Sequence, residues 1–340
     1  MSADETELED RLSAPSSALV AEAAYWPGDM AVLGAGGKMG PTLCRMARRA
    51  ADEAGRRDMR IFAVSRWSDA GAARRLKDAG VEPIEFALSA DADFDALPDA
   101  QSVVYMVGVK FGAADRPFEA WAANAVLPAL TARRYAESSI AAFSTGNVYP
   151  FTTASSGGST EDNPPDPVGE YAMSCLGRER VFEHAAHARG TRVALLRLNY
   201  AVEPRYGVLA DVARAVHAGE RVDLTTAHVN VVWQRYANEV ALRCLNRAAN
   251  PPLTLNVTGP EIASARQIAT ALADLLGTSP RFRGEPQPTA LLNNAALCHS
   301  WFGYPDVPLG VLIEQQARWV ADGGVLWDKP TKYQRRDGKF

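Results

Sequence analysis

Three glycines at a spacing of three residues form the part of the sequence with the clearest chemical meaning. They follow a short apolar run (30–33) that is expected to be a buried strand, and a helical pattern begins at Pro41. Glycine lets the backbone turn tightly and approach a pyrophosphate, while the N-terminus of a helix offers N–H groups and partial positive charge. A strand, glycine turn and helix in this order predict a dinucleotide-binding turn. Its cofactor-binding residues are predicted to be Gly34, Gly37, Lys38, Met39 and Gly40.

The end of the second expected strand (61–65) bears on the choice of dinucleotide. An acidic residue there would accept hydrogen bonds from the ribose hydroxyls of NAD, and this chain has none. Ser65 and Arg66 instead suit a 2′-phosphate, which favours NADP over NAD. A solvated arginine at a strand end is the alternative interpretation.

Read as Gly-x-x-Gly-x-x-Gly, the turn resembles that of the extended short-chain dehydrogenase/reductase superfamily, which includes nucleotide-sugar epimerases and dehydratases. The segment 143–150, FSTGNVYP, resembles the family's Ser-Ser-x-x-Val-Tyr-Gly segment, and a proline-rich loop leads into Tyr171 as it does in the family. The resemblance implies that Thr145 is the catalytic hydroxyl, which hydrogen-bonds the substrate oxygen. It also implies that Tyr171 is the general acid/base that exchanges a proton with that oxygen.

One catalytic position departs from the family. The pattern Tyr-x-x-x-Lys reads Tyr171-Ala172-Met173-Ser174-Cys175 here, so Cys175 stands at the position of the lysine. In the family, the ammonium lies one helical turn from the tyrosine, lowers the pKa of the phenol and holds the nicotinamide ribose. Three interpretations stay open: a cofactor binder without turnover, an enzyme whose positive charge comes from elsewhere, or a tyrosine that works only as an acid.

Two basic residues bear on the missing charge. Lys110 follows the fourth strand in a segment (107–112) that resembles the family's cofactor-lining loop, and Val107 and Gly108 are expected to line the cofactor there. Lys110 is therefore a candidate substitute, with a solvated loop lysine as the alternative. Arg178 lies on roughly the same helix face as Tyr171, but at ~1.5 Å rise per residue we expect it to be too far away. Cys175 as a nucleophile is a further alternative for which no base partner is evident.

The resemblance continues into the second half of the chain. The segments 196–200 and 255–261 resemble the family's Leu-Arg-x-x-Asn and Asn-Val-x-Gly segments, whereas the family's acidic residue after the third strand is not evident in 86–88. Arg205 would suit a carboxylate or phosphate. Four residues between these segments are candidate substrate contacts, with ordinary surface residues as the alternative: Arg205, Tyr206, His228 and Asn230.

Alternating strand and helix patterns must position these residues. Strands are expected at 30–33, 61–65, 81–88, 102–107, 140–144 and 192–196, and helices at 70–79, 119–138 with a kink at Pro128, and 170–188. After these elements the regular alternation of strands and helices ends, and we expect helices at 208–218 and 264–276 and a strand at 229–232. The pattern predicts an α/β fold, a Rossmann-type doubly wound parallel sheet with a smaller C-terminal substrate-binding domain. The expected divisions are an N-terminal arm or helix (1–25), the dinucleotide-binding domain (26–200, with a later strand near 229–245 returning to it), a partly interleaved substrate domain (201–322) and a polar tail (323–340).

Composition narrows the class of protein. The chain has 340 residues and a net charge of -4, which gives no reason to expect nucleic acid as a partner. No apolar run approaches the ~20 residues that span a bilayer, and the acidic N-terminus has no signal core, so we expect neither a membrane partner nor secretion. Four scattered cysteines without metal-ligand spacing favour a reduced, cytoplasmic setting and no metal site.

The sequence thus predicts an NAD(P)-dependent oxidoreductase or epimerase/dehydratase that acts by hydride transfer on a sugar-like or other polyhydroxylated small molecule. A catalytically degenerate NAD(P)-binding regulatory or structural protein of the same fold is the alternative. A homodimer is expected by analogy with the superfamily.

Overall fold

The structure, a computed structural model, describes residues 3–339. The chain forms two compact units, and it passes between them several times. The first unit comprises the chain up to Ser144, Glu170–Leu196 and Asn238–Thr254, and the second comprises Thr145–Gly169, Arg197–Ala237 and the chain from Leu255. The segment 145–169, which the sequence analysis placed in the dinucleotide-binding domain, is therefore part of the second unit.

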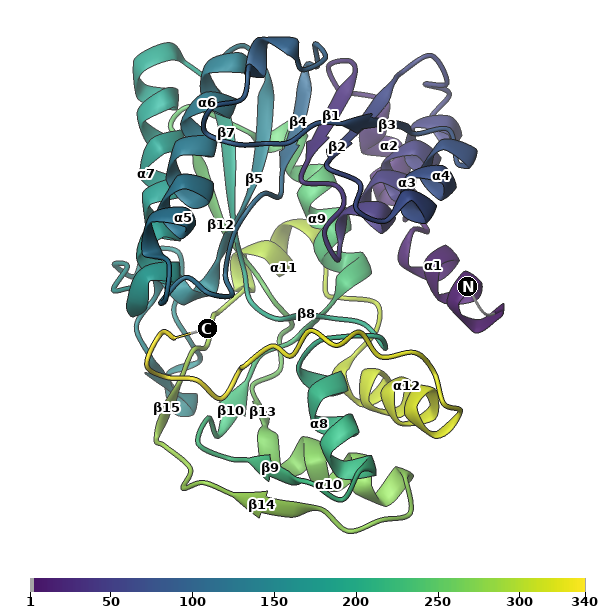
Figure 1. Cartoon of the computed structure of the whole chain (residues 1–340), viewed down its shortest axis with the longest axis vertical. Coiled ribbons are helices and arrows are strands. Elements are labelled where there is room, and N and C mark those ends of the chain that lie inside the picture. The colour runs from purple at the N-terminus through teal and green to yellow at the C-terminus, as the bar shows by residue number, and fades with distance from the viewer. Residues whose placement is uncertain (1–2, 340) are drawn as a thin grey trace. The chain divides into compact units, whose positions relative to one another are not determined.

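A seven-stranded sheet forms the centre of the first unit, in the order β12-β7-β5-β4-β1-β2-β3 (Figure 1). Its strands are β1 (Met30–Leu33), β2 (Ile61–Ser65), β3 (Glu82–Glu85), β4 (Ser102–Tyr105), β5 (Ser139–Thr145), β7 (Arg192–Leu198) and β12 (Leu253–Val257). The pairs that link β3, β2, β1, β4 and β5 are parallel. This sheet confirms the predicted α/β fold of the Rossmann type.

The strand bounds follow from burial. Every residue of β1, β4 and β5 is buried, as expected for strands covered on both faces. The third strand is shorter than the expected 81–88, since β3 is an edge strand with exposed ends and Pro83 has no N–H to donate. The later strand expected near 229–245 does not return to this sheet: short strands lie at His228–Val229 and Val232–Trp233 and pair elsewhere, most of the stretch is a helix, and β12 is the late strand that joins the sheet.

Helices cover both faces of this sheet. Figure 1 shows α5, α6 and α7 together on one side, and α3 and α4 on the other. The helices of this unit are α1 (Ala3–Leu12), α2 (Ser17–Ala23), α3 (Gly40–Glu53), α4 (Ala70–Asp78), α5 (Pro117–Trp121), α6 (Leu127–Arg134), α7 (Gly169–Arg189) and most of α9 (Gln234–Cys244). The N-terminal segment is thus helical, and it buries Leu8, Leu12 and Leu19.

The helix expected at 119–138 differs in an informative way. Between α5 and α6 lies a π-helical turn, Ala122–Val126, in which the N–H of Leu127 bonds to the carbonyl of Ala122. Pro128 has no N–H to give to the carbonyl four residues earlier, that of Asn124, which accounts for the irregularity at this point. The predicted kink is therefore a π turn just before Pro128.

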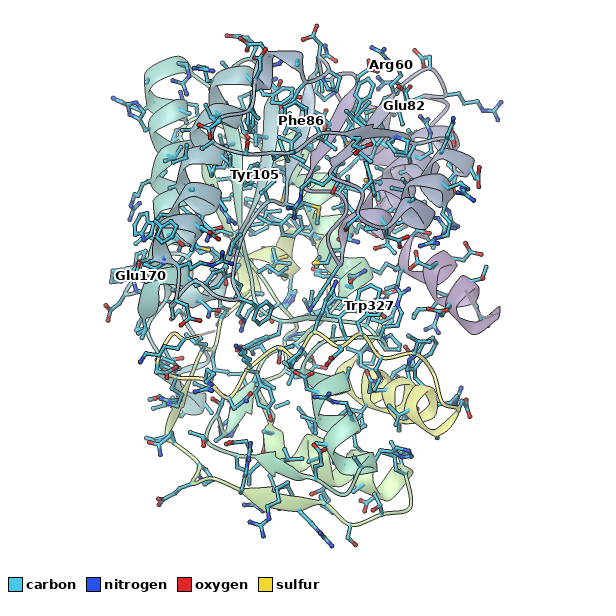
Figure 2. All side chains as sticks on the ribbon, viewed as in Figure 1. Arg60, Glu82, Phe86, Tyr105, Glu170 and Trp327 are labelled. Carbon is cyan, nitrogen blue, oxygen red and sulfur yellow. The ribbon has the colours of Figure 1, made fainter. Side chains whose placement is uncertain are left out.

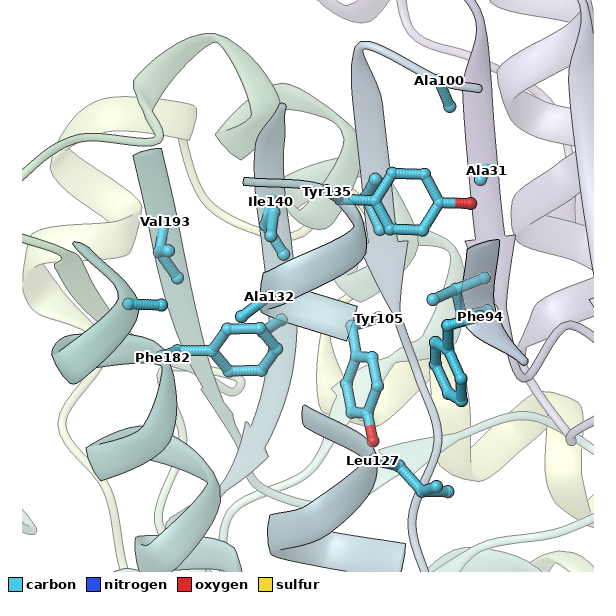
Figure 3. Packing of buried hydrophobic residues seen from close by; sticks show 14 of the residues in the cluster. Ala31, Phe94, Ala100, Tyr105, Leu127, Ala132, Tyr135, Ile140, Phe182 and Val193 are labelled. Atoms are coloured by element: carbon cyan, nitrogen blue, oxygen red, sulfur yellow. The ribbon is translucent and has the colours of Figure 1, made fainter. Parts of the chain in front are cut away.

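A large apolar cluster lies between the sheet and the α6–α7 side (Figure 3). Tyr105 of β4 and Phe182 of α7 meet edge to face, with ring centroids 5.5 Å apart. In Figure 2, Arg60 and Glu82 lie at the end of the sheet where strands β2 and β3 begin. Glu170 lies at the opposite end of the unit, where α7 begins. The carboxyl ends of the parallel strands therefore point toward the end of the unit that holds the start of α7.

The second unit is built from short strands and four helices among its described residues. They are β6 (Thr152–Thr153), β8 (Ala201–Val202), β9 (Arg221–Asp223), β10 (His228–Val229), β11 (Val232–Trp233), β13 (Ala263–Ser264), β14 (Arg281–Arg283), β15 (Thr289–Ala290), α8 (Val208–His217), α10 (Ala265–Leu275), α11 (Ala296–Phe302) and α12 (Leu309–Ala321). These strands pair two by two, as β10-β13, β11-β8, β14-β9 and β15-β6. The expected polar tail is held against this unit: Thr331 donates two hydrogen bonds to Asp211, and Tyr333 is buried.

Three further observations concern the described residues as a whole. No helix between residues 3 and 339 is long and apolar enough to cross a membrane. In the same range, no group of three or more His, Cys, Asp and Glu side chains is placed to hold a metal ion. The four cysteines are buried and form no disulfide.

Candidate active site

The glycine turn connects β1 to α3, and Gly34 and Gly40 each have a steric reason within the protein. A Cβ on Gly34 would lie 3.0 Å from the backbone nitrogen of Val107, and φ at Gly34 is +86°. A Cβ on Gly40 would lie 2.2 Å from the carbonyl oxygen of Ala35, so only glycine allows α3 to start this close to the turn. Gly36 and Gly37 are exposed, and a Cβ on Gly37 would meet only the carbonyl oxygen of Gly34, at 3.4 Å.

The N-terminus of α3 is suited to an anion. Its N-cap residue, Met39, makes no side-chain capping bond to the first turn. The turn itself is held by Asn238, which donates to the Thr42 hydroxyl at 3.1 Å, while that hydroxyl donates to the Met39 carbonyl at 3.0 Å. An uncapped helix N-terminus beside an exposed glycine backbone can bind the phosphates of a dinucleotide through its free N–H groups.

The end of β2 lies against this turn. A Cβ on Gly36 would be 2.4 Å from the Ser65 hydroxyl, so the serine and the glycine backbone are in direct contact. Arg66 is exposed. Trp67, which the sequence analysis did not single out, has φ of +47° and donates its indole N–H to the Ile84 carbonyl at 3.1 Å. The tryptophan is thereby held beside the turn, and its ring comes within 3.9 Å of the Gly36 Cβ position.

Tyr171 and Cys175 meet in the first turns of α7. The two side chains are hydrogen-bonded, and the Cys175 thiol is fully buried. Burial raises the pKa of Cys175, against the opposing effects of Arg178, Tyr171 and Lys110. The thiol is therefore neutral at ordinary pH, which removes the basis for Cys175 as a nucleophile.

Lys110 comes close to the same pair. Its ammonium lies 5.7 Å from the ring centroid of Tyr171 and 5.8 Å from that of Phe111. Lys110 is half-buried, and it follows β4 on the loop that also carries Val107 and Gly108. The structure thus brings one cation of the first unit to the face of the tyrosine ring, where cation–π attraction holds it.

Arg178 is the second cation near Tyr171, and it is fully buried in the first unit. Its guanidinium donates to the Phe143 carbonyl at 2.6 Å and to the Asn124 side-chain oxygen at 2.7 Å. Burial opposes the charge, but the nearby side chains together outweigh burial and raise the pKa of Arg178; they are Cys175, Tyr105, Tyr171 and Glu179. The arginine is charged at all ordinary pH values.

Asn124 organises this part of the first unit, and the sequence analysis did not find it. Its side chain exchanges hydrogen bonds with both backbone groups of Val109, at 3.1 and 3.0 Å, and donates to the Ser174 hydroxyl at 2.9 Å. The loop after β4, the π turn and α7 are therefore joined through one buried amide. The available signal in the sequence was Pro128, four residues later, which predicts that the helix is irregular at Asn124.

In the second unit, Thr145 is tied into its own loop. Its hydroxyl is within 3.2 Å of both the side-chain oxygen and the backbone nitrogen of Asn147, so it donates to the first and accepts from the second. The hydroxyl oxygen keeps one lone pair for a further hydrogen bond. Thr145 is suited to accept a hydrogen bond from a substrate hydroxyl, and it can donate to a substrate oxygen only after releasing Asn147.

A buried polar network fixes the segment that follows Thr145. The Tyr149 hydroxyl accepts from Arg197 at 2.6 Å and donates to Asn256 at 3.0 Å. The backbone N–H of Asn256 in turn donates to Glu161 at 2.7 Å. Glu161 has a raised pKa, because burial outweighs its hydrogen bonds and the nearby Arg197. The matched segments around 147, 197 and 256 therefore meet in three dimensions, within the second unit.

The candidate substrate contacts are mostly engaged within the second unit. Arg205 is buried and donates to Glu203 at 2.8 Å, Tyr206 stacks on Trp327 at 5.2 Å between ring centroids, and Asn230 bridges Glu261 and Asn293. The alternative of ordinary surface residues is wrong for these three. His228 is half-buried in β10.

One family model matches more than half of the sequence. The sequence model of the NAD dependent epimerase/dehydratase family matches residues 30–234. The search against proteins with curated descriptions returned no significant match.

Several solved structures share the fold. UDP-glucuronic acid 4-epimerase from Bacillus cereus in complex with NAD is 16% identical with a TM-score of 0.72, over 86% of this chain and 99% of that one. UDP-glucose 4-epimerase from Thermotoga maritima with UDP-glucose is 14% identical with a TM-score of 0.70, over 87% and 99%. dTDP-glucose 4,6-dehydratase from Bacillus anthracis in complex with NAD is 12% identical with a TM-score of 0.71, over 87% and 97%.

The family model covers more than half of the chain, and it includes the glycine turn, Thr145 and Tyr171. The chain therefore belongs to the NAD-dependent epimerase/dehydratase family, whose members are enzymes of the short-chain dehydrogenase type.

Proposed function

We propose that this protein is an NAD(P)-dependent oxidoreductase or epimerase/dehydratase that acts by hydride transfer on a sugar-like substrate. The observation that carries the proposal is the surroundings of Tyr171: a hydrogen bond to Cys175, an ammonium 5.7 Å from its ring and a buried guanidinium nearby. Positive charge favours the phenolate, so a tyrosine placed in this way can serve as a base even though the lysine is absent.

The residues would divide the chemistry between them. A dinucleotide whose phosphates lie at the Gly34–Gly40 turn would supply hydride chemistry at a carbinol or ketone carbon of the substrate. Tyr171 takes the hydroxyl proton as the carbinol is oxidised and returns it when the ketone is reduced. Thr145 orients the substrate oxygen through the lone pair that Asn147 leaves open. Lys110 supplies one positive charge at the tyrosine ring.

We propose NADP as the slightly favoured dinucleotide. The support is local: Ser65 touches the glycine turn, Arg66 is exposed at the end of β2, and neither residue is acidic. Arg66 can pair with a 2′-phosphate. Two of the solved structures named above, the Bacillus cereus epimerase and the Bacillus anthracis dehydratase, are described in complex with NAD, so the proposal concerns this chain's own residues.

The second candidate is a protein of the same fold that binds NAD(P) without turnover. The specific observation in its favour is the buried, neutral Cys175 thiol at the lysine position, which supplies neither a charge nor an ammonium for the ribose.

The first experiment is calorimetric titration with NADPH and NADH. It is followed by a turnover assay with UDP-glucose, UDP-glucuronic acid and dTDP-glucose, monitored by nicotinamide absorbance and by NMR of the sugar. Tyr171→Phe should lower turnover at least ~10²-fold while cofactor affinity is retained. Tyr25→Phe, at an exposed position, is the matched control. Full turnover in Tyr171→Phe would contradict the enzyme proposal, and cofactor binding without turnover on any sugar would favour the second candidate.

We also propose a homodimer that forms through helices beside the sheet. Exposed apolar side chains lie on α5, the π turn and α7: Phe118, Trp121, Val126 and Met173. These helices are adjacent, since Trp121 donates to Glu170 at 2.7 Å. Light scattering after size-exclusion chromatography should give a dimer for the natural protein and a monomer for Phe118→Glu. A natural protein that is monomeric would contradict this proposal.

A further inference from the structure

Arg178 is a buried charge whose hydrogen bonds leave it incompletely satisfied. The side chain is buried, and the acceptors of its hydrogen bonds, the Phe143 carbonyl and the Asn124 amide oxygen, are both neutral. Its Nε–H is buried without a hydrogen-bond partner. Burying a guanidinium is unfavourable unless its charge is compensated. The buried Glu179 side chain and the Tyr105 ring, whose centroid lies 5.6 Å from the guanidinium carbon, contribute to that compensation.

The charge lies closer to Tyr171 than the position of Arg178 along the helix suggests. Helical side chains lean toward the N-terminus of their helix, so a long side chain carries its end group back along the axis. The observed bonds show this directly. The guanidinium bonds to Asn124, Asn124 bonds to the Ser174 hydroxyl, and Ser174 donates to the Tyr171 carbonyl. The positive charge is therefore near the level of residue 174, one turn from its own Cα.

Gly108 makes the space for this guanidinium. A Cβ on Gly108 would lie 2.7 Å from Nη2 of Arg178 and 3.2 Å from the amide oxygen of Asn124. Gly108 belongs to the loop after β4, which the resemblance identifies as cofactor-lining, and it is itself exposed. The guanidinium thus lies directly against the backbone of that loop.

We propose that Arg178 is a positioning residue that supplies, from within the first unit, the positive charge that Cys175 cannot supply to Tyr171. This inference rests on the proposed function and goes beyond it by assigning the charge to a residue on the interior side of the helix. It also departs from the expectation that Arg178 is too distant, since that expectation considered helix rise alone.

Lys110 is the competing source, and the two cations differ in kind. Lys110 is half-buried on a loop and faces the ring of Tyr171, where water screens its charge. Arg178 is shielded from water and held by two hydrogen bonds. At equal distance from the phenol, its charge therefore acts more strongly than the water-screened charge of Lys110. Arg178 also interacts electrostatically with both Tyr171 and Cys175.

The test measures the ionisation of Tyr171 without needing a substrate. Cofactor-free protein labelled with 3-fluorotyrosine is titrated by ¹⁹F NMR, and Tyr171→Phe identifies the Tyr171 resonance. Arg178→Gln should move the Tyr171 midpoint upward by about one pH unit or more, whereas Arg178→Lys should leave it nearly unchanged. Lys110→Gln should produce a smaller shift than Arg178→Gln. An unchanged midpoint in folded Arg178→Gln, or a larger shift in Lys110→Gln, would overturn the inference.

A second variant keeps the test decisive if Arg178→Gln does not fold. Gly108→Ala leaves the arginine in place but forces its guanidinium aside, and it too should raise the Tyr171 midpoint. Arg48→Gln is the matched control, because Arg48 is also buried in the first unit and bonds to two backbone carbonyls. An unchanged midpoint in Gly108→Ala, or an equal shift in Arg48→Gln, would count against the inference.

The family's lysine offers a final check by double substitution. Cys175→Lys alone places two cations together in a buried site, so its thermal midpoint should fall. Cys175→Lys combined with Arg178→Gln exchanges one source of charge for the other and should return the thermal midpoint and the Tyr171 midpoint to those of the natural protein. Additive effects of the two substitutions would contradict the inference. The Tyr171→Phe turnover assay is independent of these titrations, so failure of the inference and failure of the proposed function give different results.

Discussion

Nη2 of Arg178 lies 2.7 Å from the side-chain oxygen of Asn124, and the same oxygen accepts the backbone N–H of Val109 at 3.1 Å. One neutral acceptor therefore serves a donor of a buried cation and a donor of a loop backbone together. Replacing it by an apolar residue of similar size leaves both donors buried without a partner, which is more costly than the loss of an ordinary hydrogen bond.

Asn124→Leu should accordingly destabilise the protein by about 3 kcal/mol, the cost of removing a partner from a buried charge. Urea denaturation followed by circular dichroism would measure this. Asn246→Leu is the control, since Asn246 is an exposed asparagine of the same unit that donates to the Glu22 carbonyl. Equal effects for the two variants would show that Asn124 has no special role.

The glycine turn allows a matched pair of substitutions. Gly40→Ala should unfold or strongly destabilise the protein, because its Cβ would lie 2.2 Å from the Ala35 carbonyl oxygen and the ~1 kcal/mol gain in helix propensity cannot offset that clash. Gly37→Ala meets only an ordinary contact at 3.4 Å, so it should fold normally and yet lose at least ~10-fold in dinucleotide affinity. Differential scanning calorimetry and titration calorimetry separate the two effects. Normal cofactor binding by Gly37→Ala would place the phosphates elsewhere.

The preference for NADP can be tested at the end of β2. Arg66→Ala should weaken NADPH binding by about tenfold and leave NADH binding unchanged, because only NADPH carries the 2′-phosphate. Arg57→Ala, another exposed arginine, serves as the control. Equal affinities of the Arg66 variant and the natural protein for NADPH would restore the interpretation of a solvated arginine.

Acid sensitivity of the second unit should depend on His299. Burial lowers the pKa of His299, while the hydrogen bond with the Thr258 carbonyl and the charge of Glu261 act in the opposite direction. In the unfolded chain, His299 binds a proton at about pH 6.5, whereas in the folded protein it does so only at lower pH. The free energy of unfolding is therefore highest above about pH 6.5 and falls as the pH drops below that value. Thermal midpoints at pH 7.5 and 5.5 should differ less in His299→Asn than in the natural protein. His187→Asn, at an exposed position, should behave like the natural protein.

The sequence by itself determined the features that are local along the chain. The glycine turn was predictable because strand, turn and helix are consecutive, so Gly34, Gly37 and Gly40 carry their steric requirements in their spacing. The alternation of strands and helices predicted the parallel sheet for the same reason, since each apolar run had to be buried on both faces. The absence of the lysine at Cys175 was likewise visible without coordinates.

Only the tertiary structure decided what surrounds Tyr171. Arg178 meets Asn124 across 54 residues and lies beneath Gly108 across 70, and helical spacing shows only that Arg178 is on a buried face, not which groups it meets there. The π turn that presents Asn124 arises from a missing donor at Pro128 together with packing against α7. Periodicity in a sequence reports the direction in which a side chain points. The partner it finds depends on how separate elements pack, and that packing is what brings the Arg178 guanidinium to Asn124 and to the backbone at Gly108.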